Sequence, residues 1–152
     1  MSKDIEQELD AILTPHKARV SAARDEAAGR SAAAAEFVEA AAVCLGSVVV
    51  PTLEAMARAL NERGIAARLR SDAGGARIDI PVSRHVRLGH GLGGYPYFRA
   101  RPETQLRRIC FEQNSAGGRG ASAVGDYAVA EVTGDLVKEK VLALLRQIFG
   151  AG

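Results

Sequence analysis

Residues 65–82 read IAARLRSDAGGARIDIPV, and here the sequence leaves helical periodicity for a period of two. Apolar residues alternate with small or charged ones on both sides of the turn sequence Asp72-Ala-Gly-Gly, at Ile65, Ala67, Leu69, Ile78, Ile80 and Val82. Such alternation around a glycine turn predicts a β-hairpin with one apolar and one charged face. Because Pro81 cannot donate to a β-ladder, we expect it on an edge strand or where the pairing ends.

The chain after this hairpin predicts more strands and then a helix. Tyr95–Arg101 and Leu106–Glu112 flank the turn sequence Pro102-Glu-Thr-Gln and indicate a second hairpin. Tyr127–Val132 is expected to be the last strand. Thr133 can cap a final helix over Asp135–Phe149, with Gly150 after its end.

The chain before the hairpin predicts a long helix over Ala32–Arg63. Its apolar residues recur at spacings of three and four, at Val38, Ala42, Leu45, Val49, Leu53, Met56 and Leu60. Pro51 is expected to bend this helix, because its ring opposes the carbonyl of Ser47. The β-branched run Val48–Val50 leaves a strand ending at Pro51 as the alternative.

Two shorter helices are expected in the first 30 residues. Ile5, Leu9 and Ile12 have helical spacing in an acidic segment, which Pro15 should interrupt or kink after Leu13. A second helix over His16–Ala28 should end at a break over 29–31.

The predicted fold class is therefore α+β. We expect N-terminal long helices as a helical hairpin or antenna, an antiparallel sheet of four or five strands, and a C-terminal helix packed on the sheet. Residues 1–30 are expected to be a helical extension, and residues 31–152 a single α+β domain.

Charge is divided unevenly along the 152 residues. Residues 65–125 hold no lysine, and their ten arginines and four carboxylates give 10 − 4 = +6. Residues 1–64 give 7 − 10 = −3 and residues 126–152 give 3 − 4 = −1, which add to the total of +2. A basic segment hidden in a near-neutral chain indicates an anionic or acidic partner.

The predicted sheet would carry this charge on the face opposite its core. The candidate residues for binding an acidic partner or another anion are Arg68, Arg70, Arg77, Arg84, Arg87, Tyr95, Tyr97, Arg99 and Arg101. Arginine and tyrosine on one sheet face also suit single-stranded nucleic acid, whose bases stack on rings and whose phosphates meet guanidinium groups. The default interpretation of such a face is that its charges are solvated and discourage edge pairing.

No sequence motif assigns a catalytic, cofactor or metal site. Gly89-His-Gly-Leu-Gly-Gly precedes a predicted strand rather than the helix that a phosphate loop requires. His85 and His90 lie among arginines, which oppose a bound cation. Cys44 and Cys110 occur in apolar segments and are expected to be reduced core residues. A small enzyme with a site in the glycine-rich loops is the least favoured class.

The apolar helices need a packing partner, which is either the rest of their own chain or another subunit in a homo-oligomer. Only 5% of the residues are aromatic, and much of the apolar content is alanine, whose burial stabilises little. A helix made mostly of alanine therefore needs a partner surface. The candidate oligomer interface comprises Val38, Leu45, Val49, Leu53 and Met56. The apolar run over 40–53 is shorter than the roughly 20 residues of a membrane span, and the N-terminus is polar, so we expect neither membrane insertion nor a signal peptide.

These observations predict a non-catalytic, cytoplasmic interaction module without a cofactor. It would form homo-oligomers through its helices and bind an acidic protein through the arginine-bearing sheet. A nucleic-acid-binding protein using the same surface is the alternative.

Overall fold

A computed structural model describes residues 2–82, 95–115 and 120–150. The chain divides into two compact units, Met1–Glu36 and Phe37–Gly152. The first unit contains most of helix α1 (Ser2–Cys44). Every side chain from Asp4 to Ala32 is exposed.

Helix α1 is continuous, so the predicted interruption at Pro15 and the predicted break over 29–31 are wrong, as is a helical hairpin within residues 2–44. Proline removes one backbone hydrogen bond, and glycine costs about 1 kcal/mol relative to alanine. Both costs are local, and the flanking residues are mainly alanine, arginine, lysine and glutamate, which have high helix propensity.

The second unit begins with a helical run that changes its winding before Pro51. One π-helical turn, η1 (Leu45–Val49), joins α1 to α2 (Val50–Glu62), with the Val50 amide donating to the Leu45 carbonyl. Pro51 then occupies the start of α2, where its missing N–H is tolerated. The predicted long helix is thus confirmed, with one wider turn just before Pro51, and the bend expected at Pro51 stays a prediction.

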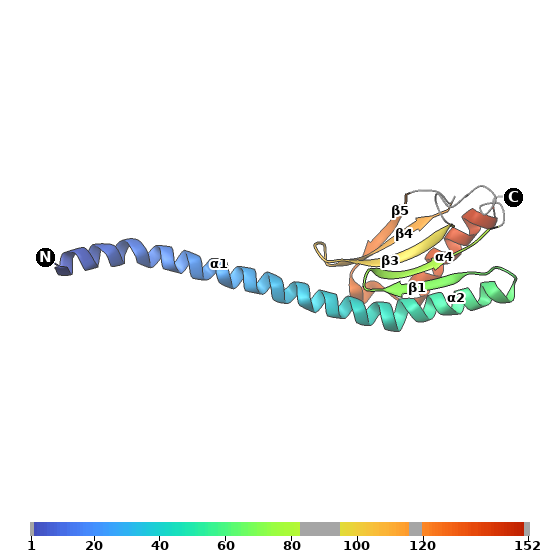
Figure 1. Ribbon diagram of the computed structural model, residues 1–152, viewed down its shortest axis with the longest axis horizontal. Coiled ribbons are helices and arrows are strands. Elements are labelled where there is room, and N and C mark those ends of the chain that lie inside the picture. The colour runs from blue at the N-terminus through green and yellow to red at the C-terminus, as the bar shows by residue number, and fades with distance from the viewer. Residues whose placement is uncertain (1, 83–94, 116–119, 151–152) are drawn as a thin grey trace. The chain divides into compact units, whose positions relative to one another are not determined.

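Five strands form one antiparallel sheet in the order β1-β2-β3-β4-β5 (Figure 1). They are β1 (Arg68–Asp72), β2 (Gly75–Asp79), β3 (Tyr97–Glu103), β4 (Arg108–Asn114) and β5 (Ser122–Tyr127). The α+β class and both predicted hairpins are confirmed. Pro81 lies beyond the end of β2, and the Ile80 amide just before it donates to the Pro96 carbonyl at 2.8 Å.

The predicted last strand over Tyr127–Val132 is misplaced. β5 ends at Tyr127, and a short 3-10 helix, η2 (Val129–Glu131), follows it. The apolar residues of that segment serve the core without sheet pairing, since Val132 is buried and Val129 packs against the core. Periodicity alone could not distinguish these two uses.

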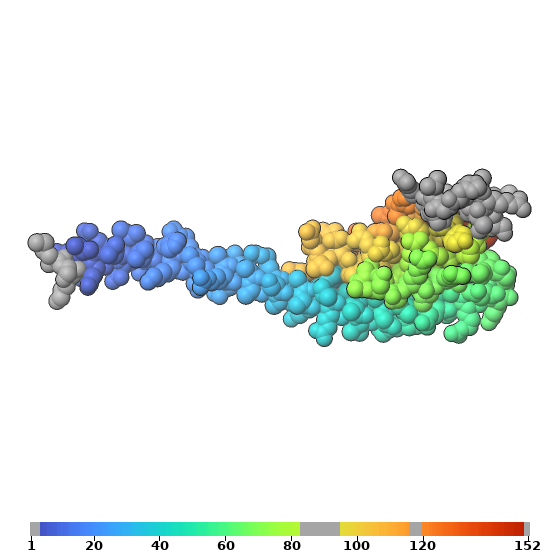
Figure 2. Space-filling view, viewed as in Figure 1, coloured from blue at the N-terminus to red at the C-terminus, as the bar shows by residue number. Residues whose placement is uncertain are grey.

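The core lies between one face of the sheet and a layer formed by η1, α2 and α4 (Gly134–Phe149). Fully buried side chains from the strands include Ile78, Phe98, Ile109 and Phe111, and those from the helices include Val49, Leu53, Val137, Val141 and Leu144. Phe98 and Phe111 meet edge to face with ring centroids 5.2 Å apart. In the space-filling view the β1–β2 hairpin lies along α2 (Figure 2).

Candidate functional site

Every charged residue of the five strands lies on the sheet face away from the helices. In the strand register, Arg77 and Arg99 pair directly and Arg99 pairs with Glu112, while the apolar residues between them face the core. This outer face carries six arginines and five carboxylates, a net 6 − 5 = +1: Arg68, Arg70, Arg77, Arg99, Arg101 and Arg108 with Asp72, Asp79, Glu103, Glu112 and Asp126. The face is therefore arginine-rich but almost neutral.

Asp79 compensates two of these arginines. Its side chain is only 6% exposed, and its Oδ1 atom lies 2.7 Å from a terminal guanidinium nitrogen of Arg77. Its Oδ2 atom lies 3.4 Å from the Nε atom of Arg70 and accepts no hydrogen bond from the residues that the structure describes. Arg77 in turn covers the ring of Tyr97, with its guanidinium carbon 3.9 Å from the ring centroid. One ring face of Tyr97 is thus already occupied by an arginine of the same chain.

Two further arginines are paired across β3, β4 and β5. Arg101 donates to Glu112 and, at 2.9 Å, to Glu103. These hydrogen bonds, first the one to Glu112, raise the pKa of the Arg101 guanidinium. Arg108 pairs with Asp126 and lies 3.8 Å from a carboxylate oxygen of Glu131.

Arg68 and Arg99 make no ion pair among the residues that the structure describes. Arg99 donates to the Gly74 carbonyl at 2.8 Å and so supports the β1–β2 turn. Arg68 lines a hollow of about 220 Å³ together with Arg70, Tyr95 and Asp79. The structure therefore brings Arg68, Arg70 and Tyr95 together, whereas Arg84, Arg87 and the glycine-rich loop around them lie outside the described residues.

The residues expected at an oligomer interface do not share one surface. Leu45, Val49 and Leu53 are buried in the core of their own chain, which removes them from any interface of the folded unit. Val38 is 52% exposed. Met56 is partly buried and lines a groove between α2 and α4.

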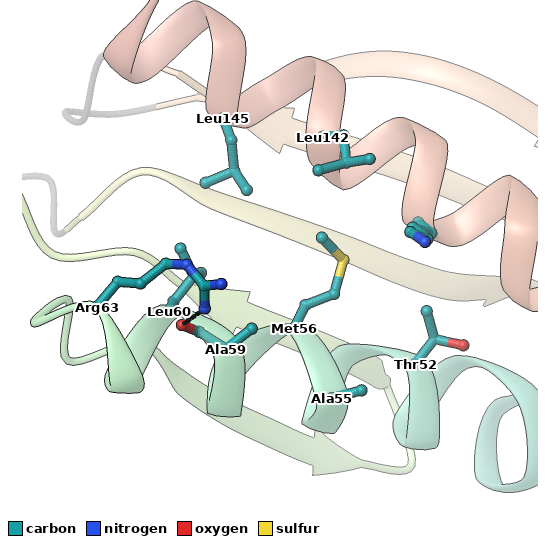
Figure 3. A pocket seen from close by; sticks show the side chains of 9 residues that line it. Thr52, Ala55, Met56, Ala59, Leu60, Arg63, Leu142 and Leu145 are labelled. Carbon is teal, nitrogen blue, oxygen red and sulfur yellow. Dashed lines mark hydrogen bonds between the residues drawn. The ribbon is translucent and has the colours of Figure 1, made fainter.

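This groove, called here the α2–α4 groove, is an apolar hollow on the described surface. It has a volume of about 460 Å³ and is lined by Thr52, Ala55, Met56, Ala59, Leu60, Arg63, Lys138, Leu142 and Leu145. Figure 3 shows Leu142 and Leu145 of α4 pointing toward Met56 and Leu60 of α2. Its size falls in the range of about 300–1,000 Å³ that is typical of ligand pockets.

The two charged residues that line the α2–α4 groove are both cations. Arg63 donates to the Ala59 carbonyl at 2.8 Å, and its exposed side chain lies 4.0 Å from a carboxylate oxygen of Glu62, which is outside the lining. Lys138 is exposed and makes no ion pair within the described part of the chain. None of the nine lining residues is acidic. The groove thus combines an apolar floor with positive charge at its edge.

Sequence reasoning found Met56 but not the groove. The available signal was a pair of alanines, Ala55 and Ala59, which flank the apolar stripe of α2 and are exposed in the structure. Alanines beside an apolar stripe leave room between neighbouring helices. That the room lies next to α4 depends on tertiary packing, which the helical period does not encode.

The described residues hold neither a metal-binding cluster nor an activated thiol. No group of three or more metal-ligating side chains occurs within them. Cys44 and Cys110 are free thiols, and burial raises the pKa of each, which disfavours the reactive thiolate. The glycine-rich loops proposed for an enzyme site fall mostly in 83–94 and 116–119, outside the described residues.

One helical stretch is long and apolar enough to cross a bilayer by length and composition alone. It lies in Asp4–Glu62, where an 18-residue window has a mean hydropathy of 1.8 and 28% of the window is buried. Core helices of soluble proteins meet the same criterion. Leu45, Val49 and Leu53 in this stretch pack against the sheet core.

Comparison with known proteins adds no relative: no family model, no curated protein and no solved structure matches this chain.

Proposed function

We propose that this chain is a non-catalytic interaction module that binds an acidic amphipathic helix in the α2–α4 groove and self-associates through its helices. The observation that carries the proposal is the groove lining, in which apolar side chains of two helices are accompanied by Arg63 and Lys138 and by no acid. An amphipathic helix can place its apolar face in such a groove, with anchors at i, i+4 and i+7.

This proposal keeps the acidic partner that the charge pattern predicts and moves it to another surface. On the outer sheet face, Arg70, Arg77, Arg101 and Arg108 already have carboxylate partners. An acidic ligand would have to replace those partners, whereas Lys138 has none among the described residues. Desolvated apolar contact at the groove floor also supplies affinity that exposed ion pairs do not.

A model peptide tests the groove directly. The probe is a fluorophore-labelled synthetic helix with leucines at i, i+4 and i+7 and glutamates between them, and a scrambled peptide of the same composition is the control. Fluorescence anisotropy should show binding to the full chain, and Ala59→Glu should weaken it at least about tenfold by filling the groove with an acid.

Arg58→Glu is the matched control, since Arg58 is exposed on α2 next to Ala59 but does not line the groove. It should leave peptide binding within about twofold. Equal binding by both variants, or no preference over the scrambled peptide, would refute the proposed function.

Nucleic acid binding by the outer sheet face is the second candidate, and one observation favours it. Arg68 and Tyr95 line a common hollow, and Arg68 and Arg99 lack carboxylate partners among the described residues. Binding of a single-stranded oligonucleotide should then weaken steeply with salt, and Arg68→Ala and Arg99→Ala should each reduce the salt slope by about 1. No retention of the oligonucleotide at low salt eliminates this candidate.

We also propose a cytoplasmic, reducing location. Its support is the pair of free thiols, Cys44 and Cys110, together with the burial of the most apolar helical residues in the chain's own core. Fractionation of the native protein into soluble and membrane pools tests this, and a purely membrane-bound pool would contradict it.

A further inference from the structure

We propose that the occupant of the α2–α4 groove is the acidic start of α1, residues 4–13, from a second copy of this chain. The inference rests on the proposed function and names the partner of the same groove. Two copies would exchange these segments reciprocally.

The segment has the anchor pattern that a helix-in-groove contact needs. Ile5, Leu9 and Ile12 follow the i, i+4, i+7 spacing and are 59%, 49% and 67% exposed. Leu13, beside them, is 42% exposed. Large aliphatic side chains in this state lack the stabilisation that burial gives, so a partner surface that covers the stripe would add stability.

The dimensions of the segment and the groove agree. Along α2 the groove runs from Thr52 to Arg63, which is about 16 Å of helix at 1.5 Å per residue. Ile5 to Ile12 spans about 10 Å by the same rise, so all three anchors fit within the length of the groove. The exposed alanines Ala55 and Ala59 allow a third helix to approach closely.

Charge also agrees, and it selects this segment over the rest of α1. Residues 1–14 contain Lys3 and four acids, Asp4, Glu6, Glu8 and Asp10, for a net 1 − 4 = −3. The groove lining contributes Arg63, which has the exposed Glu62 4.0 Å away, and Lys138, which makes no ion pair among the described residues. The later part of α1, residues 15–35, contains Lys17 and three arginines against two acids and so has the wrong sign.

A second copy is the occupant because the groove and the segment are present in every molecule. Reciprocal exchange gives two identical contacts and closes a symmetric dimer without leaving either surface open. The competing arrangement is a dimer through the exposed Val38 of α1, and it predicts that Val38→Glu alone abolishes the dimer.

Light scattering on a size-exclusion column with the full chain tests these arrangements. The unmodified chain should have twice the mass of one copy. The double variant Leu9→Glu/Ile12→Glu and the single variant Ala59→Glu should each raise the dissociation constant of the dimer by at least about tenfold. Val38→Glu and Arg58→Glu should leave the dimer unchanged.

An equimolar mixture of the two weakened variants sharpens the test. Ala59→Glu retains an intact segment, and Leu9→Glu/Ile12→Glu retains an intact groove, so one contact can form between unlike copies. The mixture should form dimers that contain one copy of each variant, at concentrations where neither variant dimerises alone. A monomeric unmodified chain, loss of the dimer in Val38→Glu alone, or a mixture that stays monomeric would overturn the inference.

The model peptide separates failure of this inference from failure of the proposed function. Leu9→Glu/Ile12→Glu should bind the model peptide at least as tightly as the unmodified chain, because its groove is intact and unoccupied. Peptide binding with no segment exchange would retain the proposed function and refute the self-docking inference. If the groove binds a fatty acid tightly and binds neither the model peptide nor the segment 4–13, both the proposed function and the self-docking inference are refuted. The groove would then belong to a small apolar anion.

Discussion

Asp79 organises the charged face of the sheet. Its register partner in β3 is Tyr97, and it lies between the guanidinium groups of Arg70 and Arg77. Arg70 pairs with Arg77 and Arg77 with Arg99 across the strands, an arrangement of like charges that destabilises a sheet unless a counter-charge is present. Asp79 supplies that charge at the cost of its own burial.

Asp79→Asn should therefore lower the free energy of unfolding by about 2 kcal/mol, because it removes the charge that holds Arg70 and Arg77. Urea denaturation followed by circular dichroism measures this. Glu54→Gln is the control, since Glu54 is exposed and makes no ion pair in the described part of the chain. Equal midpoints for the two variants would contradict the role of Asp79.

Cys44 gives the chain a pH-dependent contribution to stability. Burial raises the pKa of its thiol in the folded state. Above the ordinary thiol pKa of about 8.5 the unfolded chain loses a proton that the folded chain keeps, so the stability falls as the pH rises beyond that value.

Comparison with Cys44→Ala isolates this contribution from other groups. The stability advantage of the unmodified chain over Cys44→Ala should be smaller at a pH of about 9.5 than at about 7.5. The measurement is the difference between the two urea midpoints at each pH. A constant difference would mean that the Cys44 thiol ionises equally in both states.

At the scale of single residues, the sequence predicted which face of the sheet a side chain lies on better than it predicted how buried that side chain is. Alternation placed Arg68, Arg77 and Arg99 on the outer face, as the register shows. It gave no sign that Asp79 is buried on that face, because its cover consists of side chains from neighbouring strands. Cross-strand neighbours follow from register, which a period of two does not specify.

The helices and strands were predicted correctly where a local sequence signal agreed with the packing of the folded chain. Thr133 caps α4 as expected, with its hydroxyl oxygen accepting from the Leu136 amide at 3.1 Å. The opposite case is α1, where proline and glycine signals predicted breaks that flanking helix formers override. The strand prediction after Tyr127 is wrong for a third reason, because the alternating apolar residues there pack against the core without pairing in the sheet.

The cap of α4 can be tested by a pair of substitutions. Thr133→Ala should destabilise the chain by about 1 kcal/mol, because one amide at the helix start loses its acceptor. Thr133→Ser keeps the hydroxyl and should stay within about 0.5 kcal/mol of the unmodified chain. Thermal or urea unfolding separates the two outcomes, and equal losses would show that the methyl group, not the hydroxyl, matters.

At the scale of the whole molecule, the uneven charge comes from the arginines of residues 65–125 and the acids near the N-terminus. Six of the ten arginines in residues 65–125 lie on the outer sheet face, where carboxylates nearly balance them. Arg107 lies in the β3–β4 turn, and the remaining three belong to segments outside the described residues. The acidic counterpart is concentrated in residues 1–14, whose charge is −3. The proposal assigns this acidic segment to the cationic α2–α4 groove of another copy.

Photo-crosslinking from position 9 tests that assignment most directly. A photoreactive amino acid replaces Leu9 in copies labelled with heavy nitrogen, these are mixed with unlabelled full-length chains, and crosslinked peptides are identified by mass spectrometry. We predict crosslinks from the labelled segment to unlabelled peptides that contain Met56, Leu60, Leu142 or Leu145. Crosslinks only between peptides of the same copy, or crosslinks between unlike copies that avoid α2 and α4, would contradict the account.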